Sequence, residues 1–287
     1  MLGYLLVAPG YFLGPLAALL LISRLASLRE WIWLIGSVLG IAYLLRMSGG
    51  LAVHLPQAGL ILVSGGFAAA TLWKPPAPFF RRAVIAVAAA AIAMAIWFLA
   101  LHLSWSDLIR SESSAWRSQL EMSSQLLSRS LDPDEVSRFI TTWAPLYPGL
   151  QALAAMAGLA LAWAWYHRIA SWPRGAPLGR LRSFRFSDHA IWLLIASLAL
   201  IVMPVPETAD ALGRNLLLVL VVLYALRGLG VFVTSAARVS RAVVGMIAVI
   251  SVALFPFAAG GLALLGVADT WLDFRRHLAP PLGGVKQ

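Results

Sequence analysis

The chain has 287 residues, of which 61% are hydrophobic and only 12% are charged, and its mean hydropathy is +0.84. Soluble globular domains carry roughly 25% charged residues, so this composition excludes an ordinary soluble protein and indicates a polytopic helical membrane protein. The net charge of +10 comes mostly from basic residues in short loops between apolar segments. This is the positive-inside pattern, and it argues against nucleic acid as a partner. The chain has no cysteine, which excludes disulfides and thiolate metal sites.

Eight apolar stretches, give or take one, are predicted to be membrane segments. The first four are Leu2–Ile22, Trp31–Leu45, Leu51–Trp73 and Ala83–Leu103. The others are Tyr147–Tyr166, Ala190–Val205, Ala209–Ser235 and an irregular last segment from Arg241 to Arg276. The predicted fold is an all-α polytopic transmembrane bundle that forms one integral membrane domain, residues 1–287. Its parts are an N-terminal region (1–104), an extramembrane region (105–145) and a C-terminal half (146–276).

The stretch Trp105–Ser130 is too polar to span a bilayer but has the period of a helix. Apolar residues recur along one face, at Trp105, Ile109, Trp116, Leu120 and Leu127. We place Glu112 with the other charged residues on the remaining faces, so the helix is predicted to be amphipathic and interfacial. Asp132 as N-cap and Pro133 predict a second short helix that ends near Trp143. An alternative is that these two helices form a lid over a cavity.

The distribution of arginine among the loops predicts the orientation. The loops after the first, third, fifth and seventh spans are the basic ones, above all residues 168–185, so we place them in the cytoplasm. This puts the N-terminus and the amphipathic helix on the outer side. The basic tail reaches the cytoplasmic side only if the last segment breaks near Pro256 or Gly260–Gly261 and turns back.

The candidate site residues are Arg227, Tyr224, Asn215, Asp269 and Asp273. Arg227 lies well inside the seventh span, where a lone charge is costly and needs a partner or a polar cavity. Asp269 and Asp273 share a helical face, and three interpretations stay open: an ion-pair anchor, a ligand or ion contact, and acid–base catalysis. If the last segment turns back, Asp269 reaches the depth of Arg227, so we expect these two residues to be in contact.

Sequence motifs for catalysis and metal binding are missing. The five histidines show no HExxH spacing, and neither a GxSxG nucleophile motif nor a Walker A loop occurs. We therefore expect a protein that is not an enzyme and has no catalytic residues, no cofactor and no bound metal.

Three stretches of the second half carry a family resemblance: Leu146–Leu150, Gly213–Leu229 and Leu265–Arg275. Over roughly Leu146 to Arg276 the chain resembles the YybS-like family of uncharacterised bacterial membrane proteins. The resemblance implies a multi-pass protein of the bacterial inner membrane, distantly similar to the substrate-binding S-components of energy-coupling-factor transporters.

Together, composition, site residues and resemblance lead to two interpretations of function. The first is a non-enzymatic inner-membrane protein, like a transporter subunit, that lies in the lipid bilayer and binds a small molecule or a lipid. The alternative is a structural or assembly subunit that binds other membrane proteins.

Overall fold

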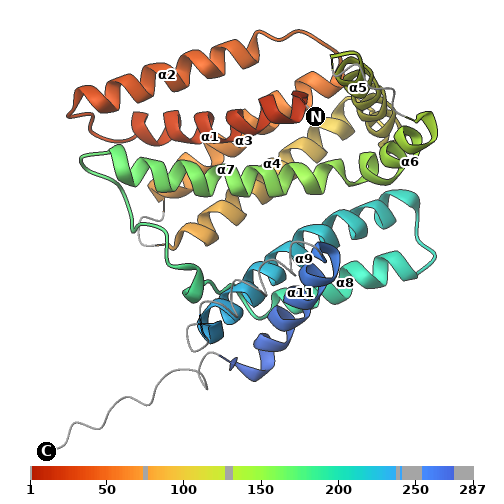
Figure 1. The fold of residues 1–287 in the computed structure, drawn as a ribbon. Helices are drawn as coiled ribbons and strands as arrows, with labels where there is room; N and C mark the ends of the chain where they lie inside the picture. The colour runs from red at the N-terminus through yellow and green to blue at the C-terminus, as the bar shows by residue number, and fades with distance from the viewer. Residues whose placement is uncertain (1, 74–76, 127–131, 237–239, 241–253, 275–287) are drawn as a thin grey trace, which may run out of the picture. The chain divides into compact units, whose positions relative to one another are not determined.

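The structure, a computed structural model, describes residues 2–73, 77–126, 132–236, 240 and 254–274. The regular elements in these residues are all helices, as the composition predicts. They form two compact units, Met1–Leu178 and Gly179–Gln287, and we describe each by itself (Figure 1). The boundary between the units lies in the basic segment that follows the fifth predicted span.

The first unit contains α1 (Leu2–Leu21), α2 (Leu28–Leu45), α3 (Leu51–Trp73), α4 (Phe79–Ala100), α5 (Trp105–Leu126), α6 (Pro133–Trp143), the short 3₁₀ turn η1 (Ala144–Leu146) and α7 (Tyr147–Ile169). The predicted N-cap of α6 is confirmed, because the Asp132 side chain accepts a hydrogen bond from the Asp134 amide at 3.0 Å. Helix α2 begins three residues earlier than predicted, since Ser27 and Glu30 form a capping box. Local capping chemistry therefore explains where these helices start.

Glycines set the packing of the first unit. Gly10 faces Leu60 and Gly14 faces Ser64, so α1 and α3 run parallel. Gly158 of α7 lies so close to Tyr11 of α1 that an added Cβ would be 2.6 Å from the Tyr11 carbonyl oxygen. Small residues allow such close approach between membrane helices. The core that results is buried among α1, α3, α4 and α7, where Phe67, Leu159 and Trp163 are fully enclosed.

The loops after α1 and α7 meet at one end of the first unit. The Glu30 carboxylate accepts hydrogen bonds from the Ala26 and Ser27 amides at 2.6 and 2.8 Å and from the Ser171 amide at 2.5 Å. Helices α5 and α6 lie at the opposite end (Figure 1). Two of the basic loops predicted to be cytoplasmic, those after α1 and α7, are thus on one end of the first unit and the amphipathic helix is on the other. Which end faces the cytoplasm stays a prediction.

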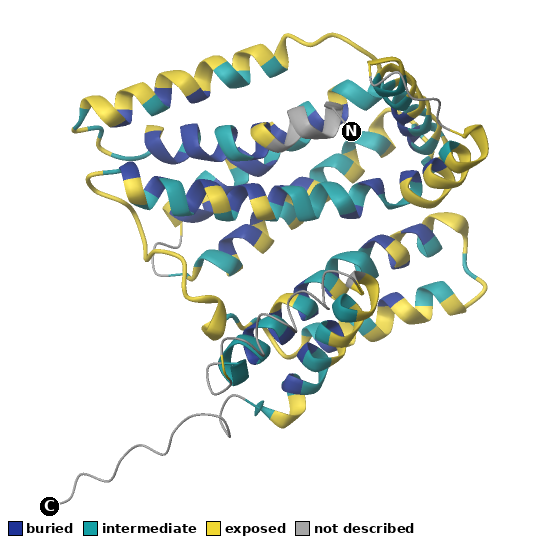
Figure 2. Cartoon of the chain, viewed as in Figure 1, coloured by how far each residue is buried: buried dark blue, intermediate teal, exposed yellow. Residues whose placement is uncertain are grey.

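Five helical stretches of the described residues are long and apolar enough to cross a membrane: Leu28–Leu45, Leu51–Trp73, Phe79–Ala100, Pro133–Ile169 and Glu207–Ala236. Three shorter apolar helices, Pro9–Leu21, Ala190–Val202 and Pro256–Leu272, accompany them. The predicted count of about eight membrane segments is therefore not confirmed. Large apolar side chains along α2, among them Ile32, Ile35 and Leu39, are exposed, as expected for a face in contact with lipid (Figure 2).

The second unit contains η2 (Leu181–Ser183), α8 (Ala190–Val202), α9 (Glu207–Ala236) and α11 (Phe255–Leu272). Gly228 of α9 lies against Leu262 and Gly266 of α11, and Gly266 also lies against Tyr224, so α9 and α11 cross at these two glycines. Likewise Gly213 of α9 meets Ser197 of α8. The long α9 therefore forms the support on which the other helices of this unit pack.

The last predicted segment needs a correction. Helix α11 begins at Phe255 with Pro256 in its first turn, and it continues through Gly260–Gly261, so these glycines are not a break. The other predicted break point, Pro256, is in the first turn of α11, and the return of the chain before it stays a prediction. Residues 241–253, the first part of that segment, lie outside the described residues.

Candidate functional sites

Arg227 of α9 is the centre of a charge cluster in the second unit. Its Nε donates a hydrogen bond to Asp269 Oδ2 at 3.0 Å, and its Nη2 donates to the Asp269 carbonyl oxygen at 3.1 Å. Its Nη1 donates to Asp188 Oδ1 at 2.8 Å. The side chains of Arg227 and Asp269 are 3% and 0% exposed, whereas that of Asp188 is 64% exposed. The expected contact between Arg227 and Asp269 is therefore present, and Asp188, which the sequence did not indicate, is a second partner.

The other three candidate residues lie at different distances from this cluster. Tyr224 is buried one turn before Arg227, and its ring packs edge-to-face on Phe186, which also lies 5.7 Å from the Arg227 guanidinium. Asp273 forms an exposed ion pair with Arg185. Asn215 lies three turns away along α9, and its side chain donates to the Ala211 carbonyl oxygen at 2.8 Å. The structure does not bring Asn215 to the Arg227 cluster.

Two glycines place the charged groups of this cluster. An added Cβ at Gly228 would be 1.9 Å from the Leu262 carbonyl oxygen, and one at Gly266 would be 1.9 Å from the Tyr224 carbonyl oxygen. The backbones of α9 and α11 therefore touch at this crossing. Arg227 precedes Gly228 by one residue, so its side chain starts beside the crossing and reaches Asp269 on the neighbouring helix α11. This geometry favours the ion-pair interpretation of the candidate residues.

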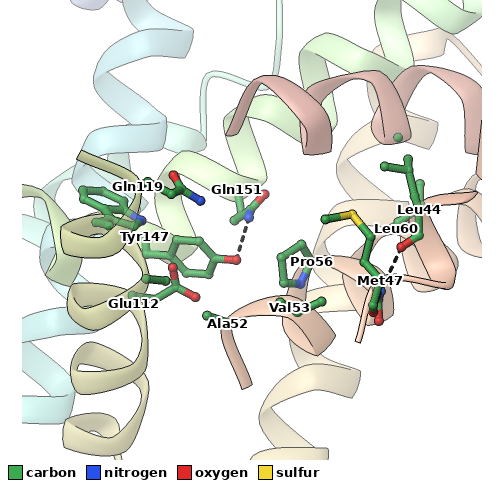
Figure 3. A pocket seen from close by; sticks show the side chains of 14 residues that line it. Leu44, Met47, Ala52, Val53, Pro56, Leu60, Glu112, Gln119, Tyr147 and Gln151 are labelled. Carbon is green, nitrogen blue, oxygen red and sulfur yellow. Dashed lines mark hydrogen bonds between the residues drawn. The ribbon is translucent and has the colours of Figure 1, made fainter. Parts of the chain in front are cut away.

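A pocket of about 130 Å³ lies in the first unit, at the end that carries α5 (Figure 3). Residues of α1, α3, α5 and α7 and from the end of α2 line it. Most of the lining is apolar, and the polar residues are Gln57, Glu112, Gln119, Tyr147 and Gln151. Figure 3 shows Glu112 and Tyr147 on one side, across from Ala52, Val53 and Pro56 on α3.

Glu112 is a functional candidate that the sequence analysis missed. The prediction that it lies on a polar face of α5 is wrong, since the residue is only 2% exposed. It lies one turn from Leu108 and one turn from Trp116, and both are buried with it. That i, i+4, i+8 spacing is the signal by which it could have been found. The face packs inward because α5 contacts both α3 and α6.

Burial raises the pKa of the Glu112 carboxyl to about 8, although hydrogen bonds from Trp116 and Tyr147 act in the opposite direction. Desolvation disfavours the charged form of a carboxyl, so at neutral pH this group is mostly protonated. Its Oε1 atom has no hydrogen-bond partner among the described residues. A buried carboxyl in a pocket, with one oxygen unused, is a candidate ligand contact.

Hydrogen bonds hold two of the pocket amides in place. Gln57 Nε2 donates to the Leu44 and Met47 carbonyl oxygens, both at 2.9 Å. Gln151 Nε2 donates to the Tyr147 hydroxyl at 2.7 Å. These bonds connect α3 to the end of α2 and fix the polar side chains at the start of α7. The walls are therefore preorganised, which lowers the entropic cost of binding a ligand.

Metal binding finds no support in the described residues, where no group of three or more His, Cys, Asp or Glu side chains could hold an ion. The Arg227 cluster pairs its carboxylates with a guanidinium, and the pocket contains a single carboxyl. The chemistry that these sites offer is ion pairing in the second unit and hydrogen bonding in the first.

The raised pKa of Glu112 predicts a specific pH dependence of stability. The folded protein binds this proton more tightly than the unfolded chain, whose carboxyl has the ordinary value of 4.5, so stability falls as pH rises between those two values. Each pH unit well inside that window contributes roughly 1.4 kcal/mol and the slope halves at the folded-state pKa of about 8, so we expect a loss of roughly 2 kcal/mol between pH 6 and pH 8. Unfolding in detergent micelles across this range, monitored by circular dichroism, measures the loss.

The matched variants for this prediction are Glu112→Gln and Glu121→Gln, which both lie on α5. Glu121 is exposed, so its variant should follow the wild-type profile. Glu112→Gln should remove most of the decline, because the neutral amide has no proton to lose. Parallel profiles for wild type and Glu112→Gln would contradict the assignment.

Comparison with known proteins supports the membrane assignment and leaves the activity open. No curated protein and no solved structure matches the chain. A family of membrane proteins does match, over residues 9–270, which covers both units and both candidate sites. The chain therefore belongs to the family described as "Predicted membrane protein (DUF2232)".

Proposed function

We propose that this protein binds a small molecule in the pocket beneath α5 and works without catalysis, as a transporter-like subunit of the bacterial inner membrane. The observation that carries the proposal is a preformed, mostly apolar pocket with one buried carboxyl, Glu112. Ligand sites have this composition: apolar walls give affinity, and a few polar groups fix the orientation.

The size of the pocket limits the ligand. An engineered apolar cavity of about 150 Å³ takes up benzene, so a pocket of about 130 Å³ fits a molecule or a molecular end of similar size. The pocket is lined by residues from five helices of the first unit, so a bound ligand would contact all five. A lipid headgroup or an acyl chain as a whole is too large, and we infer a small solute.

Helix α5 fits the lid that the sequence left as an alternative. It is amphipathic, it contacts α3 and α6, and it brings Glu112, Ala115, Trp116 and Gln119 to the pocket. Because this lid carries Glu112, a ligand that binds the carboxyl would also hold α5 over the pocket. The resemblance of the second half of the chain to the YybS-like family, and its distant similarity to S-components of energy-coupling-factor transporters, is part of this proposal. S-components bind substrates, so the resemblance agrees with a solute-binding role.

The test uses a pocket-filling variant and para-fluorobenzyl alcohol, a neutral probe of the right size. Ala115→Phe should weaken binding at least tenfold, or about 1.4 kcal/mol, because the ring occupies the pocket. Ser118→Phe on the same helix is the control: Ser118 is exposed and does not line the pocket, so binding should be unchanged. Fluorine NMR of the detergent-purified protein reports binding, and its circular dichroism confirms that each variant is folded.

The proposal fails if the wild type does not bind the probe, or if Ala115→Phe binds it as well as Ser118→Phe does. The first unit then serves the alternative role, a structural or assembly subunit that binds other membrane proteins. Purification in mild detergent would in that case yield a stoichiometric complex.

A further inference from the structure

Two oxygen atoms in the lining of the pocket can accept hydrogen bonds from a ligand. Two buried acceptor atoms in its lining, Glu112 Oε1 and Gln151 Oε1, have no hydrogen-bond partner among the described residues. Two of the three glutamine amides in the lining already donate within the protein: Gln57 Nε2 to two carbonyl oxygens and Gln151 Nε2 to the Tyr147 hydroxyl. An unsatisfied buried acceptor costs about 1–3 kcal/mol, so a ligand that donates hydrogen bonds here gains that free energy.

The charge around Glu112 is unbalanced. The titratable residues on the elements packed against α5 are Tyr11 of α1, His54 of α3, and Asp134, Glu135 and Arg138 of α6, together with Tyr147 at the start of α7. Among these, only Tyr147 lines the pocket with Glu112. The described residues of the lining therefore include a carboxyl and no cation. A ligand that brings a positive charge would supply the missing partner.

We infer that the pocket binds a small organic ammonium ion, a primary ammonium group on a short apolar or aromatic body, and that Glu112 releases its proton to solvent as the ion binds. The inference rests on the proposed function of the same pocket. The step is balanced: the carboxylic acid loses one proton, the carboxylate pairs with the ammonium, and the net charge of the occupied site is zero. Two of the three ammonium hydrogens match Glu112 Oε1 and Gln151 Oε1.

Two further features favour an ammonium ion over other ligands. The rings of Trp116 and Tyr147 line the pocket beside Glu112, and aromatic faces attract organic cations. A divalent metal needs several oxygen ligands, usually with more than one carboxylate, and the described lining has one. An anion is disfavoured, because it would meet a carboxyl and no positive side chain in this lining.

The test compares three ligands of nearly equal size: para-fluorobenzylammonium, para-fluorobenzyl alcohol and para-fluorobenzoate. At pH 8 the ammonium should bind the wild type at least tenfold more tightly than the alcohol, and the benzoate should bind least. Below pH 8 the affinity for the ammonium should fall about tenfold per pH unit, since the raised pKa of Glu112 means that a proton must first be displaced. The affinity for the alcohol should not change in this way. Fluorine NMR titrations from pH 6 to pH 8 measure all three.

Glu112→Gln separates the possible results, because the amide keeps the shape of the side chain without its charge. It should abolish the preference for the ammonium and the pH dependence, so that the ammonium binds this variant no more tightly than the alcohol does. Glu121→Gln, on the exposed face of α5, should behave like the wild type. If the alcohol binds but the ammonium binds no better, or if its advantage survives in Glu112→Gln, the inference is overturned and the proposed function stands. If none of the three binds, both fail.

Discussion

Replacing Arg227 by methionine is expected to destabilise the second unit by about 3–5 kcal/mol, because it leaves the Asp269 carboxylate buried without its partner. Asp269→Leu should cost less, since Arg227 keeps Asp188 as a second carboxylate partner. The double variant Arg227→Met/Asp269→Leu should recover at least half of the summed loss. Apolar residues of similar volume often replace a buried ion pair at little cost. Equilibrium unfolding of the four proteins in mixed micelles gives the coupling energy.

The exposed pair of Arg185 and Asp273 provides the control for this cycle. Its side chains are 47% and 39% exposed, and exposed ion pairs typically contribute less than about 1 kcal/mol. Asp273 has a positive φ of 38°, so asparagine, which tolerates this conformation, is the suitable replacement. Asp273→Asn should thus be nearly neutral. A double variant at 227 and 269 that loses the full sum of the single losses would show that the two charges are not coupled.

The second large effect is expected at the crossing of α9 and α11. Gly228→Ala should destabilise the second unit by about 3 kcal/mol or more, because the new Cβ would be 1.9 Å from the Leu262 carbonyl oxygen. The obstacle is backbone and not a flexible side chain, so the two helices must separate. Gly266→Ala should have a similar effect, since its Cβ would meet the Tyr224 carbonyl oxygen at 1.9 Å. Thermal unfolding in detergent measures both.

Gly260→Ala and Gly261→Ala are the matched controls on the same helix. Nothing lies within 4 Å of a Cβ added at either position. Alanine is favoured over glycine in a helix interior by about 0.5–1 kcal/mol, so these variants should be neutral or slightly more stable. A loss at Gly260 as large as the loss at Gly228 would mean that helix propensity, and not the crossing, decides the result.

Much of the helix pattern was predictable from the sequence because its causes are local. Apolar runs and their boundaries gave α3 at the predicted residues, Leu51–Trp73, and the Asp132–Pro133 start gave α6. Boundaries moved where a cap extended a helix, as Ser27 and Glu30 did for α2. The number of spans is a separate matter: among the described residues, five helical stretches are long and apolar enough to cross a membrane, so the count of about eight is not confirmed.

The pairing of Arg227 with Asp269 was predictable in part. A buried arginine needs a carboxylate, and few carboxylates occur in the C-terminal part of the chain. The predicted break at Gly260–Gly261 was wrong, because α11 is continuous there, and the contact forms where α9 and α11 cross at Gly228 and Gly266. Asp188 was missed because it precedes Arg227 by 39 residues and joins it only when α8 packs on α9. Partner choice depends on which helices pack together.

The sequence by itself determined that this is a helical membrane protein with basic loops, where its helices lie, and that Arg227 requires a partner. Only the tertiary structure decided that Glu112 is buried and that a pocket exists. The hydrophobic period of α5 was interpreted as if water covered one face and lipid the other. In the structure α5 packs against α3 and α6, so Glu112, which shares a helical face with Leu108 and Trp116, is buried. The pocket joins residues from Gly10 to Gln151, and contacts so distant in sequence are set by packing, which local patterns do not encode.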